Sequence, residues 1–126
     1  MQAKEVSLTE YLYRRSYSRP PLKFLNPDGS ATSRVFKLRE KDENKLSVDV
    51  KSMTTFEKSI KDQTQFVLFE IYNSHVYEIG LKTFHDPSPN GFNDAHAIIV
   101  GMKIEDDDIL PGLLARKSKR VTFIPL

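Results

Sequence analysis

Residues 66–72 read FVLFEIY, and this stretch decides the fold. Its β-branched and aromatic side chains favour an extended strand, and its almost continuous apolar character predicts a strand in the middle of a sheet. The chain around it has 126 residues, of which 39% are hydrophobic. That is enough apolar surface for one core but not for two, so we expect residues 1–126 to form a single domain.

Three strands are predicted upstream of this stretch. Residues 10–17 are rich in tyrosine and are followed by Pro20-Pro21, through which no helix continues, so they predict a first strand. In residues 45–51 (KLSVDVK) every second residue is apolar, as in a strand with one buried face. Residues 34–39 (RVFKLR) predict a further strand, which a polar turn at residues 40–44 joins to the strand at 45–51.

Two short helices are predicted from the residues at their ends. Thr54 to Glu57 has the spacing of a capping box, which indicates a helix from about residue 55 to residue 62. Near the carboxyl end, acids at 106–108 precede an apolar segment and bases at 116–117 follow it, an order that suits the dipole of a helix.

The segment after residue 72 leaves two alternatives open. Asn73 or Ser74 can cap one helical turn over residues 75–79, which Gly80 would close in the left-handed conformation. The alternative is a β-hairpin over residues 67–83 that turns at Asn73-Ser74.

The remaining segments predict strands and a loop. Residues 81–84 predict a strand, and residues 86–93 (DPSPNGFN) predict a loop. Residues 95–100 are apolar without alternation, which predicts a strand covered on both faces, and residues 121–124 predict a last edge strand. We therefore expect an α+β domain with a mixed, mainly antiparallel sheet and two or three short helices.

The composition excludes several classes of protein. The chain has no cysteine, which excludes a disulfide scaffold, a thiol nucleophile and a thiolate zinc site, and we expect a reducing, cytoplasmic location. No apolar run approaches the roughly 20 residues of a membrane span, so we expect no membrane contact. The net charge is only +2, yet residues 11–39 hold seven basic residues and one acid. The excess of positive charge is therefore concentrated in one part of the chain, residues 11–39.

Histidine and aspartate flank the proline-rich loop on both sides. His85 and Asp86 precede it, and Asp94 and His96 follow it. If the flanking strands are neighbours, these groups meet at one end of the sheet, where they can act as acid and base or hold a divalent metal. The alternative is structural: His96 donates to a backbone carbonyl beneath the loop, and the aspartates cap turns. No spacing diagnostic of a metal class occurs, so we predict no metal and no cofactor.

Residues 13–19 (YRRSYSR) interleave aromatic rings with arginines. Guanidinium groups pair with phosphate and aromatic rings stack on bases, so this composition suits a nucleotide or RNA, with Arg14 and Arg15 as ligand contacts. The alternative is an ordinary solvated strand edge. No glycine-rich phosphate loop is present, because the five glycines are isolated.

The order LYRR (12–15), PDG (27–29), KLSVD (45–49), EIGLKTFHDPSPN (78–90) and AHAIIVG (95–101) resembles a loosely defined set of small uncharacterised bacterial proteins. The resemblance spans roughly residues 11–101. It implies that Arg14, Ser47, Asp49 and His96 form a cluster, and it implies no particular reaction.

Two functions from different classes are expected. The first is a small intracellular bacterial binding or accessory protein that acts through a protein partner, because the sequence shows a core and no recognisable catalytic constellation. The second is an enzyme or ligand-binding domain for a nucleotide or RNA, including a toxin-antitoxin or defence component. The candidate catalytic residues are His96 and Asp49, and the candidate ligand contacts are Arg14, Arg15, Ser47 and His85. The sequence leaves open whether the protein is an enzyme.

Overall fold

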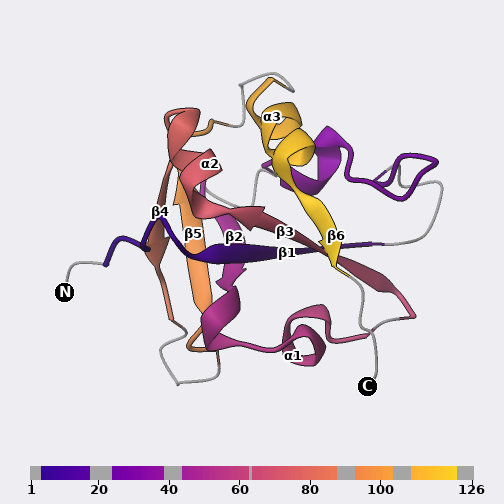
Figure 1. Ribbon diagram of the computed structural model, residues 1–126, viewed down its shortest axis with the longest axis horizontal. Helices are drawn as coiled ribbons and strands as arrows, with labels where there is room; N and C mark the ends of the chain where they lie inside the picture. The colour runs from indigo at the N-terminus through magenta and orange to yellow at the C-terminus, as the bar shows by residue number, and fades with distance from the viewer. Residues whose placement is uncertain are drawn as a thin grey trace.

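The computed structural model describes residues 4–17, 24–38, 44–62, 64–87, 93–103 and 109–121. Six strands form one sheet in the order β4-β5-β2-β1-β3-β6 (Figure 1), and each pairing between neighbours is antiparallel. The strands are β1 (Tyr11–Tyr17), β2 (Leu46–Val50), β3 (Phe66–Tyr72), β4 (Lys82–His85), β5 (His96–Val100) and β6 (Lys119–Val121). The predicted α+β class is confirmed.

Short helices lie on both faces of this sheet. In the view of Figure 1, α2 (Asn73–Glu78) and α3 (Ile109–Lys117) lie above it, and α1 (Phe56–Ile60) lies below it. The described residues also form two 3₁₀ turns, η1 (Ser33–Phe36), which packs against α3, and η3 (Lys51–Met53).

The main core lies between α2, α3, η1 and one face of the sheet, which we call the first face. On that face Leu12 of β1 pairs with Val50 of β2 and with Ile71 of β3, and none of the three is more than 1% exposed. Burying side chains of this size stabilises the fold by about 1.5–3 kcal/mol each. The first face therefore supplies most of the hydrophobic stabilisation.

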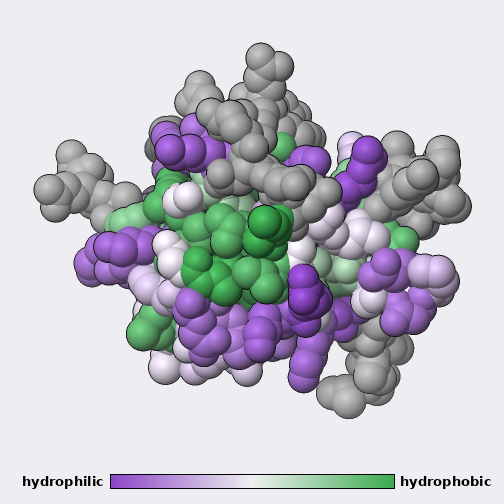
Figure 2. Space-filling model, turned by 90° about the horizontal axis from the view of Figure 1, so that it is seen from above, coloured by the Kyte–Doolittle hydropathy of each residue, from purple (hydrophilic) through white to green (hydrophobic). Residues whose placement is uncertain are grey.

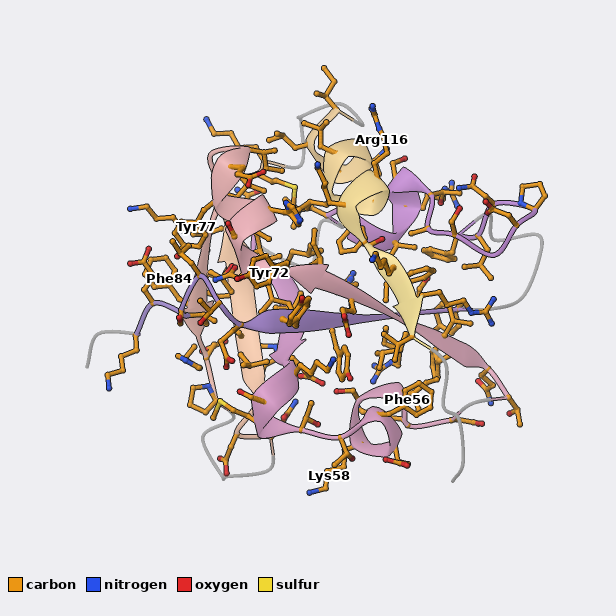
Figure 3. The ribbon with its side chains drawn as sticks, in the orientation of Figure 1. Phe56, Lys58, Tyr72, Tyr77, Phe84 and Arg116 are labelled. Atoms are coloured by element: carbon orange, nitrogen blue, oxygen red, sulfur yellow. The ribbon has the colours of Figure 1, made fainter. Side chains whose placement is uncertain are left out.

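The opposite, second face is covered over only part of its area. Beneath α1, Ile60 packs with Tyr13 and Leu68 in a smaller hydrophobic cluster that Phe56 extends. Phe56 lies against the sheet, whereas Lys58 points away from it (Figure 3). The rest of the second face, toward β2 and β5, has no helix over it among the described elements.

The strand prediction over residues 34–39 is wrong. Residues 33–36 form the 3₁₀ turn η1, in which Val35 and Phe36 are 1% and 0% exposed. A strand would direct these two neighbours to opposite faces, whereas a turn of helix buries both against α3 and the core. The strands predicted over residues 10–17 and 45–51 are present as β1 and β2.

The helical alternative after β3 is confirmed, and the hairpin alternative is wrong. Strand β4 is separated from β3 by three other strands, so the two cannot form a hairpin. Gly80 follows α2 with a φ of 90°, a conformation that glycine adopts without strain. Asn73 does not cap the helix. Its side chain is fully buried, and its Nδ2 donates to the carbonyls of Val6 and Ser7.

Strand β5 is present where it was predicted, but only its first face is fully buried. Ala97 and Ile99 are fully buried on the first face, while His96, Ile98 and Val100 are half-buried on the second. The predicted last strand is found as β6, two residues earlier; residues 122–124 and the acids at 106–108 lie outside the described residues. Within the described ranges, no helix is long and apolar enough to cross a membrane.

Candidate functional site

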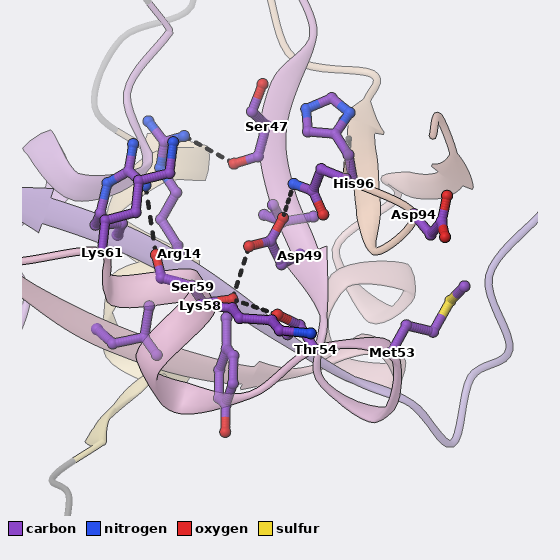
Figure 4. A pocket seen from close by; sticks show the side chains of 15 residues that line it. Arg14, Ser47, Asp49, Met53, Thr54, Lys58, Ser59, Lys61, Asp94 and His96 are labelled. Carbon is purple, nitrogen blue, oxygen red and sulfur yellow. Dashed lines mark hydrogen bonds between the residues drawn. The ribbon is translucent and has the colours of Figure 1, made fainter. Parts of the chain in front are cut away.

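A hollow of about 640 Å³ opens on the second face where the cover of α1 ends (Figure 4). Strands β1, β2 and β5 form its floor, α1 forms one wall, and residues 93–94 form the other. Because strands expose alternate residues on each face, the register decides which side chains reach this floor.

Three polar side chains lie side by side on the floor. Asp49 of β2 is opposite Tyr13 of β1 on one side and opposite His96 of β5 on the other. Ser47, two residues before Asp49, shares its face and is exposed. Burial raises the pKa of the Tyr13 phenol, an effect that the nearby ammonium of Lys51 opposes. The middle of the second face is therefore polar, in contrast to the apolar first face of the same strands.

The carboxylate of Asp49 joins the two walls of the hollow. Its Oδ2 accepts a hydrogen bond of 2.7 Å from the hydroxyl of Ser59 on α1, and its Oδ1 accepts one of 3.1 Å from the amide of Asn93. Ser59 is only 2% exposed. Both carboxylate oxygens are thus engaged by the protein, which makes Asp49 a residue that positions the walls.

The imidazole of His96 is held by one nitrogen. Nδ1 lies 2.7 Å from the carbonyl oxygen of Asp86, and because a carbonyl only accepts, Nδ1 carries the hydrogen and donates it. The Asp86 carboxylate lies 3.5 Å from the same nitrogen. This confirms the bond from His96 to a carbonyl beneath the loop. In the neutral ring Nε2 then carries the lone pair, and the side chain remains 27% exposed.

The predicted pairing of the strands that flank the loop is confirmed, but it does not bring the two histidines together. His85 of β4 is opposite Ala97, a first-face residue, so it lies on the other side of the sheet from His96 and does not line the hollow. Within the described part of the chain, no group of three or more histidine and acidic side chains is placed to hold a metal ion.

Arg14 lines the hollow but is engaged with the backbone. Strand β1 pairs with β2 only at Leu12 and Tyr13, and beyond this point the two strands separate. The guanidinium of Arg14 lies in the gap, where Nε donates to the carbonyl of Val35 at 2.8 Å. Its Nη1 donates to the carbonyl of Ser47 at 2.7 Å (Figure 4). It therefore replaces missing strand hydrogen bonds.

Positive charge lines the α1 side of the hollow. Arg15 of β1 reaches this side, where its Nη1 lies 3.4 Å from the carbonyl of Ser59. Lys58 and Lys61 are exposed on the same wall (Figure 4), while the exposed carboxylate of Asp94 lies on the opposite one. The charges are thus divided between the two walls.

Several lining residues were not named as candidate site residues from the sequence, among them Ser59, Asn93, Lys58 and Lys61. A local signal existed for α1: the hydroxyl of Thr55, one residue later than the capping box places it, accepts from the amide of Lys58. Ser59 lies one turn beyond that cap. No local signal predicts its bond to Asp49, because that contact depends on how α1 packs on the sheet.

Comparison of the chain with protein-family models, curated proteins and solved structures finds no match. The resemblance to small bacterial proteins therefore stays a prediction.

Proposed function

We propose that the protein works in the cytoplasm as a binding domain for a small phosphate-bearing ligand of the nucleotide class, held in the second-face hollow. The observation that carries this proposal is one juxtaposition: Asp49 and His96 lie opposite each other on the floor, and Arg15 and two lysines line the α1 side of the same hollow. Packing alone gives no reason to place a carboxylate, an imidazole and cationic side chains together on a part of the sheet that no described helix covers.

The charges suit a ligand with an anionic end. Lys58, Lys61 and Arg15 lie on one wall, where they can neutralise phosphate oxygens by charge-assisted hydrogen bonds. Ser47 belongs to β2 and His96 to β5, and both line the floor of the hollow. There the Ser47 hydroxyl and His96 Nε2 can contact the sugar or the base of the ligand. In this arrangement Arg14 supports the carbonyl of Ser47 and is not the phosphate ligand.

Any acid-base step on the bound ligand would pass through His96. Its Nδ1 is occupied by the Asp86 carbonyl, so Nε2 is the atom that would take or give a proton. Asp49 would act by positioning, since both of its oxygens already accept hydrogen bonds.

A structural explanation accounts for part of the site. The bond from Ser59 attaches α1 to Asp49 of the sheet, and the bond from Asn93 attaches the segment before β5 to the same side chain. The fold needs these attachments whether or not the protein binds a ligand. That explanation does not extend to His96 Nε2 or to the exposed lysines, so the test is directed at His96.

Thermal unfolding in the presence of inorganic phosphate, adenosine and guanosine phosphates, and NAD tests the proposal. At about 100 times Kd a ligand stabilises the folded state by about 2.7 kcal/mol, a readily measured rise in Tm. We expect at least one nucleotide to raise Tm, and His96→Ala to abolish the rise. His75→Ala, on α2 and remote from the hollow, is the matched control and should keep it. No rise with any compound, or an equal rise in both variants, would overturn the proposal.

The protein-partner function stays a prediction of a different class. Hydrophobic side chains gather on the surface seen from the side of α2 and α3 (Figure 2), and Ile109 at the start of α3 is 69% exposed. Co-purification from the native host tests it, and recovery of the protein without any partner would contradict it.

A further inference from the structure

A second hollow, of about 520 Å³, adjoins the first. The two share Arg14 and Arg15, which line both, so these arginines form the ridge between them. Two further basic residues, Arg34 and Lys37 of the η1 region, line the second hollow, and none of the described residues that line it is acidic. The positive wall of the first hollow therefore continues past the ridge.

The second hollow follows from the way β1 is paired. Along its whole length β1 pairs with β3, but on its other side it leaves β2 after Tyr13. The segment from Arg14 to Tyr17 consequently faces η1 and the residues around Phe24 instead of a neighbouring strand. An opening beside a strand is thus built into the sheet at the point where the arginines lie.

Aromatic rings form one side of the second hollow. The ring of Tyr17 lies 5.0 Å from that of Phe66 and 6.0 Å from that of Phe24, between ring centroids. The guanidinium of Arg15 lies 4.9 Å from the centre of the Phe66 ring. Tyr17 remains 45% exposed, so a flat ligand can reach its face. Rings beside guanidinium groups are the arrangement on which unpaired bases stack.

A buried hydroxyl also lines this hollow. Ser16 is 6% exposed, and its Oγ has no hydrogen-bond partner among the described residues. Buried polar atoms nearly always have a partner, because leaving one without costs about 1–3 kcal/mol. Ser16 is therefore a polar group of the hollow that the fold itself does not use.

We propose that the ligand is a single-stranded nucleic acid, whose backbone crosses the ridge of Arg14 and Arg15 from one hollow to the other. The inference rests on the proposed function and extends it, since a mononucleotide would fill only the first hollow. A strand places phosphates against the cations on both sides of the ridge and a base against Tyr17 and Phe66. Double-stranded helices are not expected to bind, because their bases are already stacked within the helix and are not free to stack on these rings.

Fluorescence anisotropy with labelled RNA and DNA strands of about 12 nucleotides, of the same sequence, tests this inference. The double variant Arg34→Ala/Lys37→Ala should weaken binding at least tenfold. It should also flatten the dependence of log Kd on log salt by about 1.4, because each phosphate contact contributes ~0.7. Lys4→Ala/Lys82→Ala removes the same charge from exposed residues near β4 and should change neither quantity by a comparable amount.

Base stacking has its own variant. Tyr17→Leu keeps an apolar side chain on a half-exposed position, so the fold should persist, and binding should weaken about tenfold through loss of stacking. Circular dichroism and the urea midpoint of each variant establish that it is folded.

The outcomes separate this inference from the proposed function. If a mononucleotide binds in a manner sensitive to His96→Ala and the oligonucleotides bind no more tightly, the extension is overturned and the first site stands. If the oligonucleotides depend on Arg34 and Lys37 but not on His96, the first site is overturned. Equal loss in both double variants, or tighter binding to duplex than to single strands, overturns the inference as well.

Discussion

The hydroxyl of Ser59 on α1 donates to the carboxylate of Asp49 on β2 at 2.7 Å. This bond fixes α1 over one half of the second face and so determines where the hollow begins. The other oxygen of the same carboxylate accepts from the amide of Asn93, so a single side chain holds two walls that are remote from each other in the sequence. The site and the stability of α1 are therefore linked through Asp49.

Replacing Asp49 should lower stability. In Asp49→Ala the amide of Asn93 loses its acceptor and the buried hydroxyl of Ser59 keeps only the longer contact of 3.4 Å with Thr54 Oγ1. We therefore expect the free energy of unfolding to fall by about 2–3 kcal/mol. Urea unfolding followed by far-ultraviolet circular dichroism measures the change.

Asp94 provides the control for that experiment. It lines the same hollow with the same charge but is exposed, so Asp94→Ala should change the free energy of unfolding by no more than about 0.5 kcal/mol. Equal effects of the two substitutions would show that the bonds to Asp49 contribute nothing to stability.

Arg14 should not tolerate lysine. Its guanidinium donates from two different nitrogens to the carbonyls of Val35 and Ser47, a geometry that one ammonium group on a flexible chain does not reproduce. Arg14→Lys should therefore cost about 1–3 kcal/mol in the free energy of unfolding. Arg116→Lys, on the exposed side of α3 (Figure 3), should cost less than about 0.5 kcal/mol. Similar midpoints of urea unfolding for the two variants would contradict the backbone role of Arg14.

Much of the sheet could be predicted because its strands carry strong local patterns. The apolar run at 66–72 results from burial of β3 on both faces, and the alternation at 45–51 results from burial of β2 on the first face alone, so both strands are predictable from their residues. The turn at 33–36 was missed because a short 3₁₀ turn has no period of its own, and adjacent Val35 and Phe36 also suit a strand.

The candidate site could be predicted only in part. The sequence singles out His96 beside the proline-rich loop, the resemblance adds Asp49, and the register places the two residues opposite each other. The open half of the second face could not be foreseen, because Ile98 and Val100 make β5 look like a strand buried on both faces. Which face a helix leaves uncovered depends on tertiary packing, and no local pattern carries that information.

Asn73 should be among the most sensitive positions in the chain. It is fully buried, its Nδ2 donates to the carbonyls of Val6 and Ser7, and its Oδ1 accepts from the hydroxyl of Thr83 at 2.6 Å. Asn73→Asp places an acceptor against two carbonyls and should cost about 3 kcal/mol or more in the free energy of unfolding. The neighbouring substitution Ser74→Ala is the control and should cost less than about 0.5 kcal/mol. An Asn73→Asp protein as stable as the wild type would contradict the bonding derived from its contacts.

Stability should fall at alkaline pH through Tyr77. Burial raises the pKa of its phenol above the ordinary value, and the carboxylate of Glu5, which accepts from the hydroxyl at 2.6 Å, raises it further. A group with a raised pKa in the folded state contributes stability that is complete below its unfolded pKa of about 10. That contribution is lost as the pH rises through the folded pKa, because the unfolded chain releases the proton first. The free energy of unfolding should therefore decrease from pH 10 upward.

The variant Tyr77→Phe removes the titrating phenol and should reduce this loss of stability. The variant Glu5→Gln keeps the phenol but removes the carboxylate, and should reduce the loss to a lesser extent. Part of the decrease should persist in both variants, because burial also raises the pKa of Tyr13 and the bond to Glu70 raises that of Lys51. Urea unfolding at intervals between pH 9 and pH 11 measures the decrease. If the pH dependence is the same in Tyr77→Phe as in the wild type, the phenol of Tyr77 is not perturbed by its surroundings.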